Sequence, residues 1–158
     1  MEAVVKSIGV IRSPFKSGHD VPIQAVMSDV IGEAVVFPEY SEGLESLDGF
    51  SHVILLYWCH RARPVRMLVK PYLDEHEHGL FSTRAPSRPN PIGLSTVRLM
   101  SLNGNRLVFR GADMIDGSPL LDIKPFVPEF DNRLDATSGW LAERVTGKPK
   151  LADNRFHQ

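Results

Sequence analysis

The chain has 158 residues, of which 42% are hydrophobic and 23% are charged. This length and composition predict one globular domain over residues 1–158 and exclude disordered, collagen-like and coiled-coil classes. The 18 Lys and Arg residues nearly balance the 19 Asp and Glu residues, giving a formal net charge of -1. General polycationic binding to nucleic acid is therefore excluded, and any RNA contact has to come from a local basic patch.

Cysteine content and the amino-terminal sequence favour the cytoplasm. Cys59 is the single cysteine, which excludes an internal disulfide and a cysteine-rich zinc site. The first residues lack a signal-peptide pattern, and the longest apolar run, residues 53–59, is far shorter than the roughly 20 residues that span a bilayer. We therefore expect a cytoplasmic protein with no membrane partner.

The 12 prolines and 12 glycines divide the chain into short segments of the length typical of β-strands. The predicted fold class is all-β, a single small β-barrel with short peripheral helices. Strand 51–59 is apolar on both faces, as expected in the middle of a barrel or sandwich. The complete set of expected strands is 4–11, 30–37, 51–59, 94–102, 106–110 and 120–126.

The segments between these strands carry turn and helix patterns. Residues 13–28 predict a long surface loop, and Asn103-Gly104-Asn105 predicts a hairpin turn, because Asn and Gly tolerate positive φ. A further turn is expected at residues 116–119. Short helices are expected at residues 39–47, from their apolar spacing, and at residues 139–145.

Residues 82–95 form the most unusual segment, in which three prolines alternate with polar side chains. Proline fixes its own φ and disfavours the helical region for the residue before it, so Arg88 and Asn90 are expected to be extended. Their side chains would then be presented to a substrate with little further ordering. The alternative is a rigid surface loop whose arginines meet only water.

Residues 60–70 carry several basic side chains and no acidic one, which predicts a local positive patch suited to phosphate. Nearby aromatic side chains would stack on bases if they are exposed, and the alternative is a solvated basic face above buried aromatics. The basic residues are Arg61, Arg63, Arg66 and Lys70, and the aromatic ones are Tyr57, Trp58 and Tyr72.

Other catalytic patterns are weak or missing. His76 and His78 would point to the same side of an extended chain, which allows a metal hypothesis, but a hydrophilic loop tip gives the same letters. No nucleophile elbow, P-loop or dinucleotide fingerprint is present, and Cys59 ends an apolar strand where a thiolate is disfavoured.

Five motifs taken in order resemble the TsaA-like (YaeB, TrmO) family. They are residues 8–15 (IGVIRSPF), 49–52 (GFSH), 81–84 (FSTR), 88–93 (RPNPIG) and 116–126 (DGSPLLDIKPF). The resemblance implies a small β-barrel that binds S-adenosylmethionine and works as a homodimer. It also implies methylation of N6 of threonylcarbamoyladenosine beside the anticodon of tRNA. The chain is similar in length to the short members of the family, so no additional C-terminal domain is expected.

The same resemblance implies particular site residues. Contacts to the methyl donor are expected from Pro22, Ile23, Gln24, His60, Arg61, Arg84, Leu94, Asp116, Gly117, Ser118, Pro119 and Leu120. By motif position the catalytic candidates are Asp116, Asp122 and Lys124, and sequence reasoning does not choose among them. Substrate contacts are expected from Arg88, Asn90 and Lys124, and the threonyl carboxylate of the substrate needs a cation such as Arg84, Arg88 or Lys124. No metal is expected.

Two other function classes stay open. One is a module that binds S-adenosylmethionine without catalysis. The other is a metal-dependent small-molecule enzyme built on His76 and His78.

Overall fold

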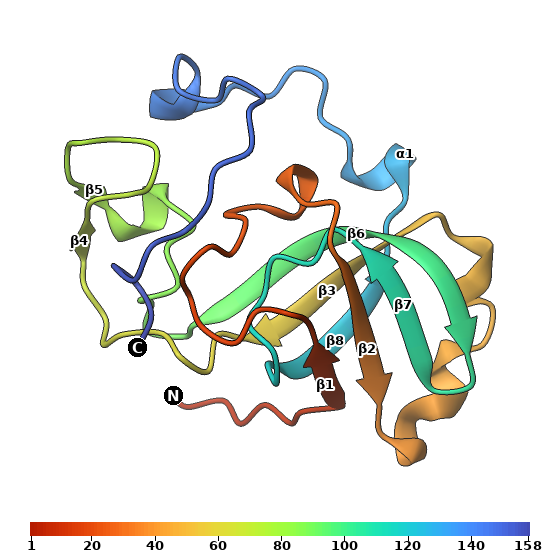
Figure 1. Cartoon of the computed structure of the whole chain (residues 1–158). Helices are drawn as coiled ribbons and strands as arrows, with labels where there is room; N and C mark the ends of the chain where they lie inside the picture. Colours follow the sequence, from red (N-terminus) through yellow and green to blue (C-terminus); the bar gives the residue numbers. More distant parts are fainter.

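A computed structural model describes residues 1–158, and its centre is a closed antiparallel barrel (Figure 1). The strands follow one another around the barrel in the order β1-β2-β7-β6-β3-β8. They span Gly9–Arg12 (β1), Ile31–Val36 (β2), His52–Trp58 (β3), Ile92–Asn103 (β6), Arg106–Arg110 (β7) and Pro119–Pro125 (β8). The prediction of an all-β fold built on a small barrel is confirmed.

The barrel interior follows the two-residue period of its strands. Val53, Leu55 and Tyr57 of β3 are buried, whereas the residues between them are half-buried. Strand β3 was expected to be buried on both faces, but only its inner face is fully covered. Leu107 and Phe109 of β7 fill the same core and are fully buried.

Two strand predictions differ from the structure. The first strand was expected from residue 4, but β1 begins at Gly9, because residues 4–7 extend past the barrel with no strand beside them. A small two-stranded ribbon, β4 (Leu68–Val69) with β5 (His78–Gly79), was not expected. Each of its strands has only two residues, too few to show an alternating pattern.

The helices are short 3-10 turns with one four-residue α-helix. The helix expected at 39–47 is divided between η2 (Pro38–Leu44) and η3 (Leu47–Gly49), and the one expected at 139–145 is limited to η5 (Gly139–Leu141). The others are η1 (Ala25–Met27), η4 (Leu80–Ser82) and α1 (Pro128–Asp131), none of which was expected. None of the helices has the length and hydrophobicity needed to cross a bilayer.

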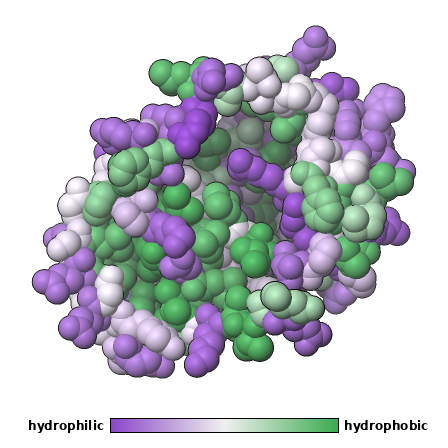
Figure 2. All heavy atoms as spheres, turned by 180° about the vertical axis from the view of Figure 1, so that it is seen from behind, coloured by the Kyte–Doolittle hydropathy of each residue, from purple (hydrophilic) through white to green (hydrophobic).

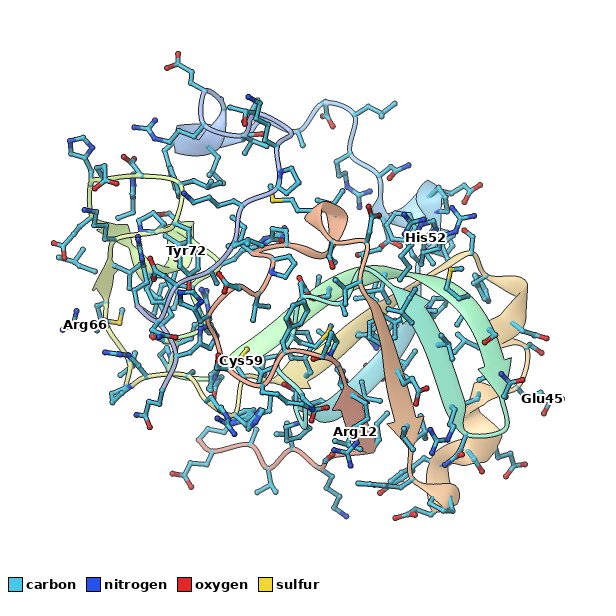
Figure 3. The ribbon with its side chains drawn as sticks, in the orientation of Figure 1. Arg12, Glu45, His52, Cys59, Arg66 and Tyr72 are labelled. Carbon is cyan, nitrogen blue, oxygen red and sulfur yellow. The ribbon has the colours of Figure 1, made fainter.

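One end of the barrel is covered by long connections. Strands β1, β3 and β7 end there, and β2, β6 and β8 begin there, so residues 13–30, 59–91 and 111–118 all gather at this end. Figure 3 shows Cys59 at this end of β3 and His52 at the opposite end. The carboxyl-terminal segment also reaches these connections, through bridges that pair Leu151 with Pro22 and His157 with Ala62. Segments far apart in sequence therefore meet here.

Candidate active site

The connection between β7 and β8 is fixed on the covered end of the barrel by the loop that follows β1. Backbone and hydroxyl hydrogen bonds hold residues 111–116 along most of their length. They run from Gly111 N and Ala112 N to Val30 O, from Ser28 Oγ to Ala112 O at 2.6 Å, from Ser13 Oγ to Met114 O at 2.7 Å, and from Asp116 N to Phe15 O. Side chains on residues 111–116 are therefore placed rigidly before any ligand arrives.

Asp116 begins the turn that leads into β8. Its Oδ2 lies 2.7 Å from Lys16 Nζ, and its Oδ1 accepts a hydrogen bond from Ser13 N. The Lys16 ammonium is the largest cause that lowers the pKa of the Asp116 carboxyl, so Asp116 is an ionised, paired carboxylate. An open hollow of about 480 Å³ lies beside it, and Arg12 and Glu33 also line that hollow.

The backbone of the same turn offers acceptors to a ligand. Gly117 has a φ of +79°, which only glycine adopts without strain, and its N–H donates to Ile11 O. The N–H groups of Asp116 and Ser118 are also bonded within the chain. The carbonyl oxygens of Asp116 and Gly117 accept no hydrogen bond, so a ligand with N–H or O–H donors fits this turn.

His60 follows β3 and faces the start of β8. Its Nδ1 is 3.3 Å from Ser118 Oγ, and that hydroxyl also donates to Ile115 O. Partial burial, and secondarily the Arg61 charge, lower the pKa of His60. The structure thus joins three of the expected contact residues, His60, Ser118 and Asp116, through one turn.

A second pair of expected contacts is joined by a direct hydrogen bond. Arg84 Nη1 donates to Gln24 Oε1 at 2.7 Å, although the two residues are 60 positions apart. Pro22 and Ile23 are held by the carboxyl-terminal segment, through the bridge to Leu151 and the bond from Ile23 N to Lys150 O. The 22–24 segment is therefore fixed at both of its ends.

Leu94 lies on the outer face of β6, where its side chain is 53% exposed, and it pairs with Leu56 of β3. Ile92, two residues earlier on the same face, is also exposed. Seen from the side opposite to Figure 1, hydrophobic residues form a broad face that is hollowed in its upper part (Figure 2). Apolar surface therefore adjoins the covered end of the barrel.

Two of the three catalytic candidates lie elsewhere. Asp122 and Lys124 form an ion pair of 2.7 Å on β8, opposite Leu56 and Ile54 of β3. Lys124 is five residues beyond Pro119, or about 17 Å along an extended strand. The structure therefore separates Asp122 and Lys124 from the Asp116 turn.

The expectation for Arg88 was wrong in one respect. Its guanidinium does not face solvent freely: Nη1 donates to the carbonyl oxygens of Leu80, Thr83 and Ala85, at 3.4, 2.9 and 3.4 Å. Bonds from Arg88 N to Pro86 O and from Ile92 N to Asn90 O close two three-residue turns, centred on Ser87 and Pro91. Asn90 remains exposed, and its side chain makes no hydrogen bond.

The basic patch is exposed, whereas two of its three aromatic neighbours, Tyr57 and Tyr72, are packed against other side chains. Arg61, Arg63 and Arg66 are exposed. Tyr57 is buried in the barrel, and Tyr72 packs on the ring of Phe156. Trp58 is half-buried, so the patch offers charge, and Trp58 is the neighbour left for base stacking.

His76 and His78 both reach the carboxyl group of Asp74, which accounts for their similar direction. His78 Nε2 lies 2.7 Å from Asp74 Oδ2, and His76 Nδ1 lies 3.2 Å from Oδ1. No group of three His, Cys, Asp or Glu side chains is arranged to hold a metal. The metal-dependent alternative therefore lacks a ligand set.

Sequence reasoning missed Ser95 and Asp113 at the covered end of the barrel, and it considered Tyr57 only as a platform for base stacking. Ser95 Oγ donates to Asp113 Oδ1 at 2.6 Å and lies 3.2 Å from the Tyr57 hydroxyl. The one available signal was an acidic residue between the apolar residues Ala112 and Met114, both of which are buried.

These features define a class of protein: a small closed barrel whose covered end gathers polar side chains for a small ligand. The profile of the tRNA-methyltransferase O N-terminal domain family matches residues 10–132. The chain belongs to this family.

Similar proteins extend the comparison. A probable S-adenosyl-L-methionine-binding protein of Pyrococcus abyssi is 53% identical over 150 residues, which are 94% of this chain and 82% of the relative. A mouse tRNA (adenine(37)-N6)-methyltransferase is 36% identical over 128 residues, 79% of this chain and 28% of that protein. The crystal structure of TrmO from Pseudomonas aeruginosa has a TM-score of 0.74 at 38% identity, covering 89% of this chain. This chain spans 63% of that solved chain.

Proposed function

We propose that this chain is an S-adenosylmethionine-dependent methyltransferase that acts on N6 of an adenine in tRNA. The observation that carries the proposal is its membership of the tRNA-methyltransferase O N-terminal domain family over residues 10–132. The names of the Pyrococcus and mouse relatives support the donor and the reaction. A non-catalytic module that binds S-adenosylmethionine is the second candidate, favoured by the name of the Pyrococcus relative alone.

The covered end of the barrel has groups that fit the donor. S-adenosylmethionine carries N–H and O–H donors on its adenine, ribose and amino group, and it supplies a methyl group on a sulfonium centre when bound. The free carbonyl oxygens of Asp116 and Gly117 match such donors. Gln24, fixed by Arg84, and His60, beside Ser118, are the side chains that would orient it.

Methyl transfer requires little further chemistry from the protein. The protein has to align the two reactants, exclude water and accept one proton from the attacking nitrogen. The hydrogen bonds that fix residues 111–116 and the 22–24 segment support alignment, because they order the site in advance.

The specific nucleoside that we propose as substrate is threonylcarbamoyladenosine beside the anticodon of tRNA. Its threonyl carboxylate requires a cation, and Arg84 is an exposed arginine that bonds Gln24 of the proposed donor site. Arg88 is engaged with backbone carbonyls, and Lys124 is paired with Asp122. The role in binding the carboxylate is therefore assigned to Arg84, and Arg61, Arg63 and Arg66 are assigned to the tRNA backbone.

We also propose that two copies of the chain associate as a homodimer. The broad hydrophobic face in Figure 2 and the exposure of Leu94 and Ile92 support this proposal, because monomers rarely expose large apolar patches. Sedimentation at micromolar concentration tests it, and a monomer that retains activity contradicts it.

The test of function is mass spectrometry of nucleosides after incubation with deuterated-methyl S-adenosylmethionine. Two tRNA samples are compared, one carrying threonylcarbamoyladenosine and one unmodified transcript. Labelled methyl on the modified nucleoside of the first sample alone supports the proposed substrate. Labelled methyl on plain adenosine contradicts the finer specificity. Calorimetric binding of the donor with no label in either sample favours the non-catalytic module.

A further inference from the structure

A chain of three polar side chains crosses the barrel interior and ends at the covered end. The Tyr57 hydroxyl is 3.2 Å from Ser95 Oγ, and Ser95 donates to Asp113 Oδ1 at 2.6 Å. When Asp113 is ionised, the single hydroxyl hydrogen of Ser95 goes to Asp113, so Tyr57 is then the donor to Ser95. Ser95 is 3% exposed and Tyr57 is 8% exposed, so water does not compete for these bonds.

The strand pairing explains why these side chains meet. Tyr57 on β3 pairs with Gly93 on β6, and a β-carbon at Gly93 would overlap the Tyr57 ring. The missing side chain lets the ring lie flat across β6, with its hydroxyl near Ser95. Ser95 pairs with Leu55 and shares its inward orientation.

Asp113 is held in place at the covered end of the barrel. Its neighbours Ala112 and Met114 are buried, and their carbonyl oxygens accept hydrogen bonds from Ser28 and Ser13. Oδ1 accepts a hydrogen bond from Ser95, and the backbone N–H groups of Ala25 and Asp113 also favour the ionised carboxylate. Asp113 is half-buried, so part of its surface faces a ligand at the covered end of the barrel.

The surroundings bring the pKa of the Asp113 carboxyl close to neutral pH. Burial is the largest cause that raises its pKa, to about 7, while the bond from Ser95, backbone hydrogen bonds from Asp113 and Ala25, and lastly the Arg84 charge lower it. The other ionisable groups nearby, Tyr57 and Cys59, have raised pKa values and are uncharged. A carboxyl group with this pKa exchanges protons near physiological pH, as a general base does.

We propose that Asp113 is the proton acceptor of the methyl transfer, with Ser95 and Tyr57 as positioning residues. The inference rests on the proposed function. N6 of the substrate attacks the methyl carbon of the donor, and the C–N bond forms as the S–CH3 bond breaks. The electron pair of that bond stays on sulfur, which gives S-adenosylhomocysteine, and the N6 proton passes to the Asp113 carboxylate.

The other candidates fit this role less well. Asp116 is paired with Lys16, and its lowered pKa makes it a weak base. Asp122 is paired with Lys124 on the outer face of β8. His60 is the remaining competitor, because its pKa is lowered and its ring is neutral at pH 7.

The main test compares Asp113→Asn with the control Asp48→Asn, an exposed carboxylate in η3. Asn keeps an acceptor for Ser95 but cannot take a proton. We expect kcat on modified tRNA to fall by at least about a hundredfold in Asp113→Asn. Affinity for S-adenosylmethionine, measured by calorimetry, is expected to stay within about threefold because the base contacts the acceptor, not the donor. Asp48→Asn is expected to match wild type in both.

Two further measurements do not depend on the activity of Asp113→Asn. In wild-type protein with carboxyl-labelled Asp, carbon NMR should show one carboxyl titrating near pH 7, and this signal should be absent in Asp113→Asn. Ser95→Ala removes a bond that lowers the pKa of Asp113, so the rise of kcat with pH should move to higher pH.

Several outcomes overturn the inference. They are an Asp113→Asn rate within threefold of wild type, no carboxyl titration near pH 7, or loss of the pH dependence in His60→Gln but not in Asp113→Asn. If the wild type is active and any of these results is obtained, only the proposed role of Asp113 is contradicted. A wild type that transfers no methyl group contradicts the proposed function together with this inference.

Discussion

Arg88 Nη1 lies 2.9 Å from the carbonyl oxygen of Thr83, and the Arg88 guanidinium stands 5.6 Å from the centre of the Phe81 ring. One side chain thus holds the turn at residues 80–85 from within. Arg88→Ala should therefore lower the free energy of unfolding by about 1 to 3 kcal/mol, because the buried carbonyls lose a charged donor. Urea unfolding measures the change.

Arg66→Ala is the matched control, because Arg66 is exposed and its guanidinium makes no hydrogen bond. It is expected to unfold like wild type. If Arg88→Ala also unfolds like wild type but loses turnover on tRNA, the residue serves the substrate and not the fold.

The backbone and the side chain of Arg88 differ in how far local sequence rules predict them. Pro89 restricts the backbone of Arg88, and that restriction is a property of adjacent residues. The direction of the Arg88 side chain depends on carbonyls up to eight residues away, which only the folded turn brings together. The barrel was predictable for the same reason, since short apolar segments between prolines and glycines and the hairpin at Gly104 are local features.

The Asp113 cluster was not predictable by such rules. Ser95 is 18 residues from Asp113 and 38 from Tyr57, and the three are brought together by the pairing of β3 with β6 and by the hydrogen bonds that place residues 111–116. Motif resemblance indicated Gln24 and Arg84 separately, but the hydrogen bond between them emerges only in the fold. Motif position also grouped Lys124 with Asp116, whereas strand geometry separates them.

Arg84 is expected to support donor binding through Gln24. Arg84→Ala removes the bond that fixes the Gln24 side chain at the barrel end, so affinity for S-adenosylmethionine should fall roughly tenfold. Isothermal calorimetry without tRNA measures this loss apart from catalysis. Arg98→Ala, an exposed arginine on β6 opposite His52, is the control and should bind normally. Equal affinities in all three proteins would contradict the proposed donor site.

Asp74 is expected to stabilise the attachment of the carboxyl-terminal segment in a pH-dependent way. Its carboxyl group, 5% exposed, contacts His78 Nε2 and, at 3.0 Å, Arg144 Nε. The bond to His78 is the largest cause that lowers the pKa of Asp74 in the folded protein. A lowered folded pKa stabilises the fold above the unfolded pKa of about 3.9, and this stabilisation is lost as pH falls below that value.

The variant Asp74→Asn tests this linkage. At pH 7 it should melt at a lower temperature than wild type, and the gap should close as pH falls below about 4. Circular dichroism melts from pH 3 to pH 8 would measure it, with Asp29→Asn as an exposed control. A gap that stays constant across this range would show that the ionised carboxylate of Asp74 does not contribute.

Gly18 is expected to be required for seating the last residues of the chain. The ring and β-carbon of His157 occupy the space that a β-carbon on Gly18 would fill. His157 belongs to the segment bridged to Ala62, and Gln158 N donates to Arg61 O. Gly18→Ala should therefore push this segment away from the barrel end and destabilise the fold by about 1 to 3 kcal/mol.

Limited trypsin digestion reports the displacement directly. Arg155 precedes the packed residues Phe156 and His157, so cleavage after Arg155 should be faster in Gly18→Ala than in wild type. His157→Gly makes room for the added methyl group, so the double variant should be less destabilised by Gly18→Ala than the single variant is. This relief depends on contact between the side chains at positions 18 and 157. If Gly18→Ala lowers the free energy of unfolding equally in the wild-type and His157→Gly backgrounds, the His157 side chain is not the reason that position 18 requires glycine.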